Sequence, residues 1–68
     1  MDEEEQEALR SRLAELETEH RDLDDVIARI VEGGPFDQLQ MQRLKKRKLM
    51  LKDQIARIKS RLLPDVIA

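Results

Sequence analysis

Few side chains in this sequence could do chemistry. The chain has one histidine, His20, two serines, Ser11 and Ser60, and no cysteine. A nucleophilic serine needs a base beside it, and neither serine lies in the repeating apolar pattern that carries His20. The carboxylates are spread along one segment and are not gathered in an apolar pocket that would shift their pKa values. We therefore expect that the protein is not an enzyme and has no catalytic residues of its own.

Metal and cofactor sites are not expected either. A lone histidine with scattered carboxylates lacks the clustered His and Cys ligands that transition metals favour. The Gly33-Gly34 pair lacks the lysine and the hydroxyl residue that complete a phosphate-binding loop. The sequence therefore predicts no metal ligands and no cofactor.

The strongest chemical signal is a dense run of positive charge in the second half of the chain. Such a run can contact phosphates without base specificity. The contacting residues would be Arg43, Lys45, Lys46, Arg47 and Lys52. Against this interpretation, the chain has a net charge of −2 and one aromatic residue, Phe36, where base stacking would use several. Nonspecific nucleic-acid binding is thus the alternative function, and not the leading one.

Two helices are expected to position these residues. Apolar side chains recur in alternating steps of four and three, which is the pattern of a helix with one buried stripe. There is one stripe in each expected helix. The first consists of Leu9, Leu13, Leu16, His20, Leu23, Ile27 and Ile30, and the second of Met41, Leu44, Lys48, Leu51, Ile55, Ile58 and Leu62. Between the two halves lies Gly33-Gly34-Pro35, and so short a connection makes the helices antiparallel neighbours.

The predicted fold class is therefore all-α, an antiparallel helical hairpin that resembles a coiled coil. We expect one domain over residues 1–68, with a first helix at about 3–32, a turn at 33–36, a second helix at about 37–63 and a tail at 64–68. Asp2 and Asp37 are the predicted N-caps. Gly33 is expected to close the first helix in a left-handed conformation. Phe36 and Met41 occupy the two positions of a hydrophobic staple, so the single aromatic residue is interpreted as packing at the corner.

His20 and Lys48 interrupt the two apolar stripes at the same height of the hairpin. A polar layer of this kind fixes the register and the association state of coiled coils. Two positive charges repel each other in a layer without water, so a neutral His20 is expected. Glu17, Glu19 or Asp24 is expected to supply the carboxylate that anchors Lys48. A pH-sensing role for His20 is a second interpretation, because an unperturbed imidazole titrates near a pH of about 6.5.

Charge is distributed very unequally between the halves of the chain. Residues 1–32 hold twelve acidic and four basic residues, and residues 35–68 hold three acidic and nine basic ones. Folding the hairpin lays the acidic helix along the basic one, which favours this pairing. Pairs within a helix are also expected at Glu17–Arg21, Asp25–Arg29 and Asp53–Arg57.

A second apolar stripe, Leu49, Ala56 and Leu63, makes the apolar face of the second helix wider than a two-helix seam requires. We therefore expect a homo-oligomer, with a dimer that forms a four-helix bundle favoured, or else a helical protein partner. The leading function is a small structural or interaction module. The interaction face would comprise Leu44, Leu49, Leu51, Ile55, Ala56, Ile58, Leu62 and Leu63.

No apolar run approaches the roughly 20 residues that span a bilayer, and the first ten residues are acidic and polar. The sequence therefore predicts no membrane partner and a soluble, cytoplasmic protein.

Two stretches resemble the YdcH-like family of short bacterial proteins, a domain of unknown function. They are Glu19-His20-Arg21-Asp22-Leu23-Asp24 and the run LKKRKLMLKDQI from Leu44 to Ile55. The positions that match the family pattern are His20, Lys45, Lys46, Lys48, Leu49, Leu51, Lys52, Asp53 and Ile55. Arg47 stands where the family pattern has an acidic residue. The resemblance covers roughly residues 9–62 and implies a bacterial helical hairpin, and it brings no activity, substrate or catalytic residue.

Overall fold

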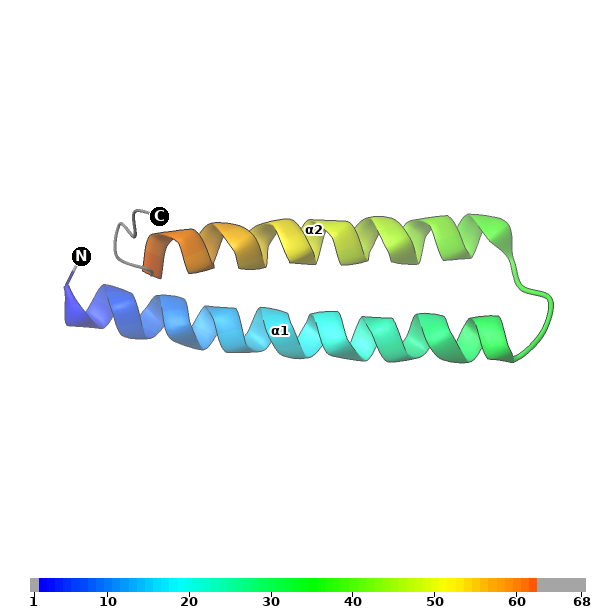
Figure 1. The fold of residues 1–68 in the computed structure, drawn as a ribbon, viewed down its shortest axis with the longest axis horizontal. Coiled ribbons are helices and arrows are strands. Elements are labelled where there is room, and N and C mark those ends of the chain that lie inside the picture. Colours follow the sequence, from blue (N-terminus) through cyan, green and yellow to red (C-terminus); the bar gives the residue numbers. More distant parts are fainter. Residues whose placement is uncertain (1, 63–68) are drawn as a thin grey trace, which may run out of the picture.

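The computed structural model describes residues 2–62, which form two α-helices and no strand. Helix α1 spans Glu3–Glu32 and helix α2 spans Gln38–Leu62. The two helices run antiparallel and side by side, so that the start of α1 and the end of α2 lie at the same end of the molecule (Figure 1). This confirms the predicted helical hairpin. The expected end of the second helix at Leu63 and the tail at 64–68 lie outside the described residues.

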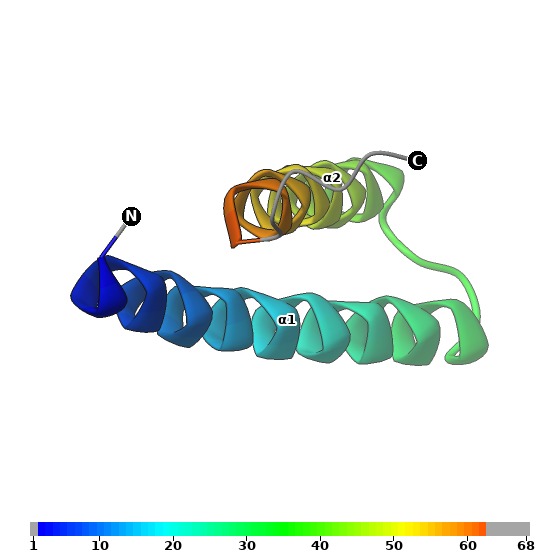
Figure 2. The same cartoon turned by 60° about the vertical axis from the view of Figure 1, so that its left-hand side comes forward.

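The hairpin is long and thin, as its two views show (Figures 1 and 2). Its extents are 49 × 25 × 16 Å, and its radius of gyration is 15.5 Å. A compact domain of this length has a radius of gyration of about 11 Å. A molecule of this shape keeps few residues away from solvent, and only Leu16, Met41 and Leu51 are buried among residues 2–62.

The core is the seam between α1 and α2. Every position of the predicted stripes, from Leu9 to Ile30 and from Met41 to Leu62, is buried or half-buried. The other described residues that are not exposed are Gln6 and Gln54. The spacing of four and three residues therefore identified the packed face of both helices, because it keeps successive side chains on one side of a helix.

Both N-cap predictions are confirmed. One carboxylate oxygen of Asp2 accepts a hydrogen bond from the backbone N–H of Glu5 at 2.8 Å. The Asp37 carboxylate accepts from the N–H groups of Leu39 at 2.9 Å and of Gln40 at 3.4 Å. These bonds satisfy N–H groups that have no partner inside the helix, and they fix where α1 and α2 begin.

The prediction that Gly33 adopts a left-handed conformation is wrong. Gly33 has φ −74° and ψ −3°, which is right-handed, and its N–H donates to the Arg29 carbonyl at 3.0 Å. The left-handed residue is Gly34, with φ 105°. Gly33 thus completes the last turn of α1, and the chain reverses one residue later, just before Pro35.

We expect that the two adjacent glycines respond differently to alanine. Gly34→Ala puts a side chain at positive φ, so it lowers the free energy of unfolding by about 1–2 kcal/mol. Gly33→Ala is the matched control: its backbone suits alanine, although the new Cβ would lie 3.3 Å from the Arg29 carbonyl oxygen. We expect a change below about 1 kcal/mol there. Urea unfolding followed by circular dichroism measures both, and equal effects would contradict the assignment of the reversal to Gly34.

Candidate interaction face

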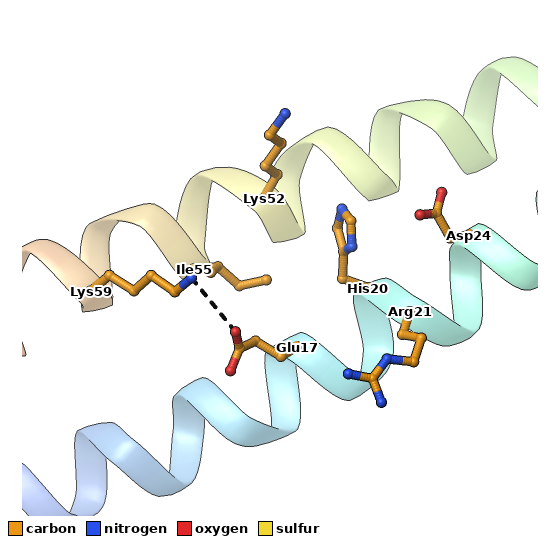
Figure 3. Close-up of a pocket in the computed structure, with 7 residues that line it drawn as sticks. All are labelled: Glu17, His20, Arg21, Asp24, Lys52, Ile55 and Lys59. Atoms are coloured by element: carbon orange, nitrogen blue, oxygen red, sulfur yellow. Dashed lines mark ion pairs between the residues drawn. The ribbon is translucent and has the colours of Figure 1, made fainter.

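One broad side of the hairpin carries two adjoining shallow depressions, and their lining combines charged and apolar side chains. The first is lined by Glu17, His20, Arg21, Asp24, Lys52, Ile55 and Lys59 (Figure 3). The second is lined by Ile27, Lys45, Lys48, Leu49 and Lys52. Because both include Lys52, they lie next to each other on the same side. We call this side, defined by these lining residues, the Leu49 face.

The residues of the predicted polar layer both contribute to this face. His20 and Lys48 are half-buried, and Lys48 makes an ion pair with Asp24. Of the three carboxylates expected as an anchor for Lys48, the structure therefore uses Asp24. Figure 3 shows His20 extending from α1 toward α2, with Asp24 further along α1. The His20 Nε2 atom is buried without a hydrogen-bond partner, so this ring contributes to the seam mainly by packing.

The polar layer shifts the pKa of the Asp24 carboxyl. A hydrogen bond from Lys48 lowers its pKa, and the positive charges of Lys48 and of a protonated His20 act in the same direction, while burial opposes them. A lowered carboxyl pKa means that the folded chain holds the charged form more firmly than the unfolded chain does.

We expect acid to weaken the hairpin partly through Asp24. Its stabilising contribution is present above the ordinary carboxyl pKa of 3.8 and is lost as the pH falls through the lower folded-state pKa. In that pH range, the wild-type chain loses more thermal stability than Asp24→Asn does. Asp25→Asn is the control, because Asp25 is exposed and makes no ion pair with residues 2–62. If Asp24→Asn shows the same acid dependence as the wild type, the pair does not contribute.

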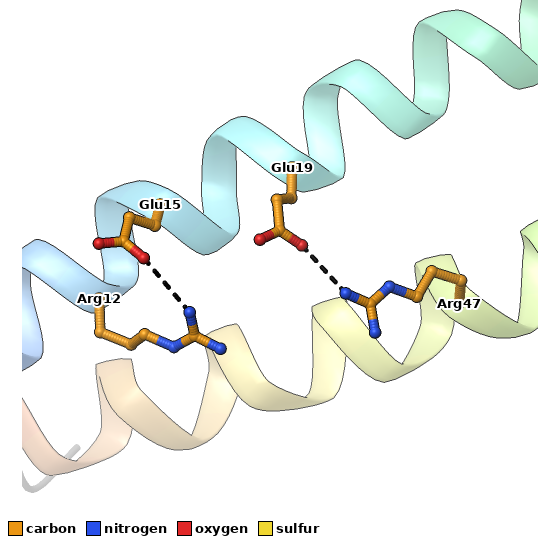
Figure 4. Close-up of polar contacts among 4 residues, drawn as sticks. All are labelled: Arg12, Glu15, Glu19 and Arg47. Atoms are coloured by element: carbon orange, nitrogen blue, oxygen red, sulfur yellow. Dashed lines mark hydrogen bonds and ion pairs between the residues drawn. The ribbon is translucent and has the colours of Figure 1, made fainter.

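Three ion pairs connect the acidic and the basic helix. Besides Lys48–Asp24, Arg47 pairs with Glu19 at 3.2 Å (Figure 4), and Lys59 pairs with Glu17 at 3.7 Å. All of these side chains are at least one-third exposed, and such pairs contribute only about 0.2–1 kcal/mol each. The pairs therefore favour this register and add little to the stability.

The pairs expected within each helix are only partly present. Arg57 and Asp53 pair at 3.1 Å as predicted, and Arg12 and Glu15 pair at 3.3 Å without having been predicted (Figure 4). The expected pairs Glu17–Arg21 and Asp25–Arg29 are absent among residues 2–62. The reason for the first is visible in Figure 3: the Glu17 carboxylate points to α2, where it pairs with Lys59.

The basic tract is exposed, and most of it has no acidic partner. Arg47 is held by Glu19, whereas the other members make no ion pair with residues 2–62; these are Arg43, Lys45, Lys46 and Lys52. Two of them, Lys45 and Lys52, line the depression beside Leu49. The positive charge of α2 is thus only partly neutralised by α1.

The structure divides the predicted interaction face into two sets. Leu51 is buried in the seam, and Leu44, Ile55, Ile58 and Leu62 are half-buried there. These five residues hold the hairpin together. Leu49 is 66% exposed and Ala56 is exposed, so they are the members that remain free to meet another molecule. Leu63 lies outside the described residues.

Several exposed apolar residues were not singled out by the sequence pattern. They are Val26, Val31, Leu39 and Met50. All four lie outside the steps of four and three, and this is the signal that could have marked them as exposed. No described helix is both long enough and apolar enough to span a membrane, and no three metal-ligating side chains gather in residues 2–62.

Comparison with protein families confirms the resemblance to the YdcH-like family. A family model described as "Protein of unknown function (DUF465)" matches residues 13–59, which includes most of both helices and the turn between them. Comparisons with curated proteins and with solved structures gave no match. Since the family match covers more than half of the chain, the protein belongs to the DUF465 family of proteins of unknown function.

Proposed function

We propose that the protein is a small, non-catalytic interaction module that acts through helix–helix association, and that its first partner is a second copy of itself. The observation that supports this is the exposure of Leu49, a large apolar side chain that is 66% exposed near the middle of α2. It lies beside a depression that also includes Ile27 from α1. Burying this side chain against another helix removes apolar surface from water, which favours association.

The surface area of the chain agrees with this proposal. The whole 68-residue chain exposes 5726 Å². A compact monomer of 8.0 kDa exposes about 4,450 Å² on the usual scaling of area with mass. The difference, about 1,300 Å², exceeds the roughly 800 Å² that each partner buries in a standard protein interface. Two hairpins that cover each other's Leu49 face would form an antiparallel four-helix bundle.

Sedimentation equilibrium over a range of protein concentrations tests the proposal. We expect a species of about twice the chain mass of 8.0 kDa, with an apparent mass that falls on dilution. A folded monomer at every concentration up to the millimolar range would rule out self-association. The Leu49 face would then be a groove for the helix of a different protein.

Nonspecific nucleic-acid binding remains the second candidate, and it is supported by the exposed cations of α2 that lack ion pairs. We expect no binding to a random DNA duplex at low salt, because acidic α1 lies beside this tract. If the duplex is bound through about four phosphates, the logarithm of the affinity falls with the logarithm of salt with a slope of about −3.6. Lys45→Gln would then weaken binding more than Arg57→Gln, because Arg57 is already paired with Asp53.

A further inference from the structure

The charges that the hairpin leaves unpaired are separated between its two helices. Among residues 2–62, the acids of α1 without an ion pair include Asp22 and Asp25, and the cations of α2 without one include Lys45, Lys46 and Lys52. The segregation seen in the sequence therefore persists on the folded surface. Over its whole surface, α1 is mainly negative and α2 is mainly positive. On the Leu49 face itself, the carboxylates of α1 are Glu17 and Asp24, which also pair with Lys59 and Lys48 of their own hairpin.

Two copies that bury the same face around a two-fold axis can be arranged in two ways. With the axis along the hairpin, both turns lie at the same end, and α1 of each copy packs on α2 of the other. With the axis across the hairpin, the turns lie at opposite ends, so that α1 packs on α1 and α2 packs on α2. Neighbouring helices are antiparallel in both arrangements, so the helix dipoles do not distinguish between them.

The charges do distinguish between them. Lys45, Lys52 and Lys59 follow one another at intervals of seven residues, which places them on one side of α2, and all three line the Leu49 face. With the turns at opposite ends, this row of lysines meets its own copy. With the turns at the same end, it meets α1 of the partner. Facing like charges are destabilising, and several such pairs select an orientation even when each is worth only a few tenths of a kcal/mol.

In the same-end arrangement, the positive residues of α2 also lie at the same height along the hairpin as the carboxylates of the partner's α1. Lys48 and Lys59 are level with Asp24 and Glu17 of their own hairpin, as the two ion pairs show. Lys52 lies between them in the sequence. An axis along the hairpin preserves these levels, so Lys52 faces the part of the partner's α1 that carries the same two carboxylates. Arg21 is the one cation of α1 on this face.

We infer that the protein forms a two-fold dimer in which α1 of each copy packs on α2 of the other and both turns lie at the same end. The inference rests on the proposed self-association and adds the orientation of the partner. It assigns to the charge asymmetry a role between copies in addition to its role within the hairpin.

Distances between spin labels test this orientation, and the absence of cysteine allows labels to be placed singly. Gln38→Cys at the start of α2 and Ser60→Cys near its end are both exposed and are separated by about 33 Å along the helix. We expect dimers labelled only at Gln38→Cys to give a distance of about 30 Å or less, since diagonal helices of a bundle lie close together. Mixed dimers with one label at each position give a distance of about 35–40 Å.

The opposite-end arrangement reverses these two distances, and this result would overturn the inference while leaving self-association intact. A sample without any distance between chains would overturn self-association itself. Salt provides a second measurement that needs no label. In the same-end dimer, unlike charges face each other, so raising the salt concentration raises the dissociation constant. In the opposite-end dimer, like charges face each other, so salt lowers it.

Discussion

Replacing Leu51 with alanine is expected to leave the chain largely unfolded. Leu51 is 2% exposed and is one of three buried side chains in residues 2–62. Removing a buried leucine side chain costs about 2–5 kcal/mol, because contacts are lost and a cavity forms. Domains have a total stability of about 5–15 kcal/mol, and a chain this short lies at the lower end. One substitution in the seam therefore removes most of the free energy of unfolding. Circular dichroism at increasing urea concentration measures this loss directly.

The neighbouring residue provides the control for this substitution. Met50 is 49% exposed on the same helix, and alanine is a stronger helix former than methionine. We expect Met50→Ala to change the free energy of unfolding by less than about 0.5 kcal/mol. If Leu51→Ala also cost less than about 1 kcal/mol, the seam between α1 and α2 would not be the main source of stability, and the hairpin would have to be held by its partner.

The fold followed from local rules that agreed with one another. The steps of four and three residues placed Leu16, Met41 and Leu51 on the packed face, because only this spacing keeps side chains on one side of a helix. Asp2 and Asp37 marked the beginnings of the helices, since a short carboxylate can accept a hydrogen bond from a free backbone N–H. These signals lie within a few residues of their effects, and the sequence therefore shows them without any knowledge of the tertiary structure.

Features that depend on the neighbouring helix were less predictable. Either glycine of the pair Gly33-Gly34 can adopt a positive φ, and the choice depends on where the chain must leave α1. Glu17 has a possible partner four residues ahead in its own helix and another across the seam, and the two ion pairs differ little in free energy. In the structure, Glu17 pairs with Lys59 of α2. Such choices between equivalent partners are set by side-chain directions that a linear pattern does not contain.

The candidate interaction face could be predicted only in part. The sequence correctly marked Leu49 and Ala56 as outside the main stripe, because they are shifted by one residue from Lys48 and Ile55. It grouped them with residues such as Leu51, which the hairpin uses for its own core. Only the packed structure shows which residues of the wide apolar face of α2 stay exposed once α1 has packed against the rest of that face.

Leu49→Glu is expected to separate association from folding. In the proposed dimer, the substitution places a carboxylate in an apolar contact of both copies, and an unpaired charge is costly to bury. We expect the dissociation constant of the dimer to rise by about 100-fold or more, which corresponds to roughly 2.7 kcal/mol. The hairpin itself is expected to keep its helical content, because Leu49 is exposed within it.

Met50→Glu is the matched control for this prediction, because it introduces the same charge one residue later, on a side of α2 that does not line the Leu49 face. We expect sedimentation equilibrium to give Met50→Glu a dissociation constant within about threefold of the wild type, since exposed substitutions away from an interface change free energies by about 0.5 kcal/mol or less. Circular dichroism of both variants shows whether the hairpin is intact. If Leu49→Glu associates as tightly as the wild type, the chains meet through another surface. If both variants lose association equally, the effect is one of net charge, and the Leu49 face has no special role.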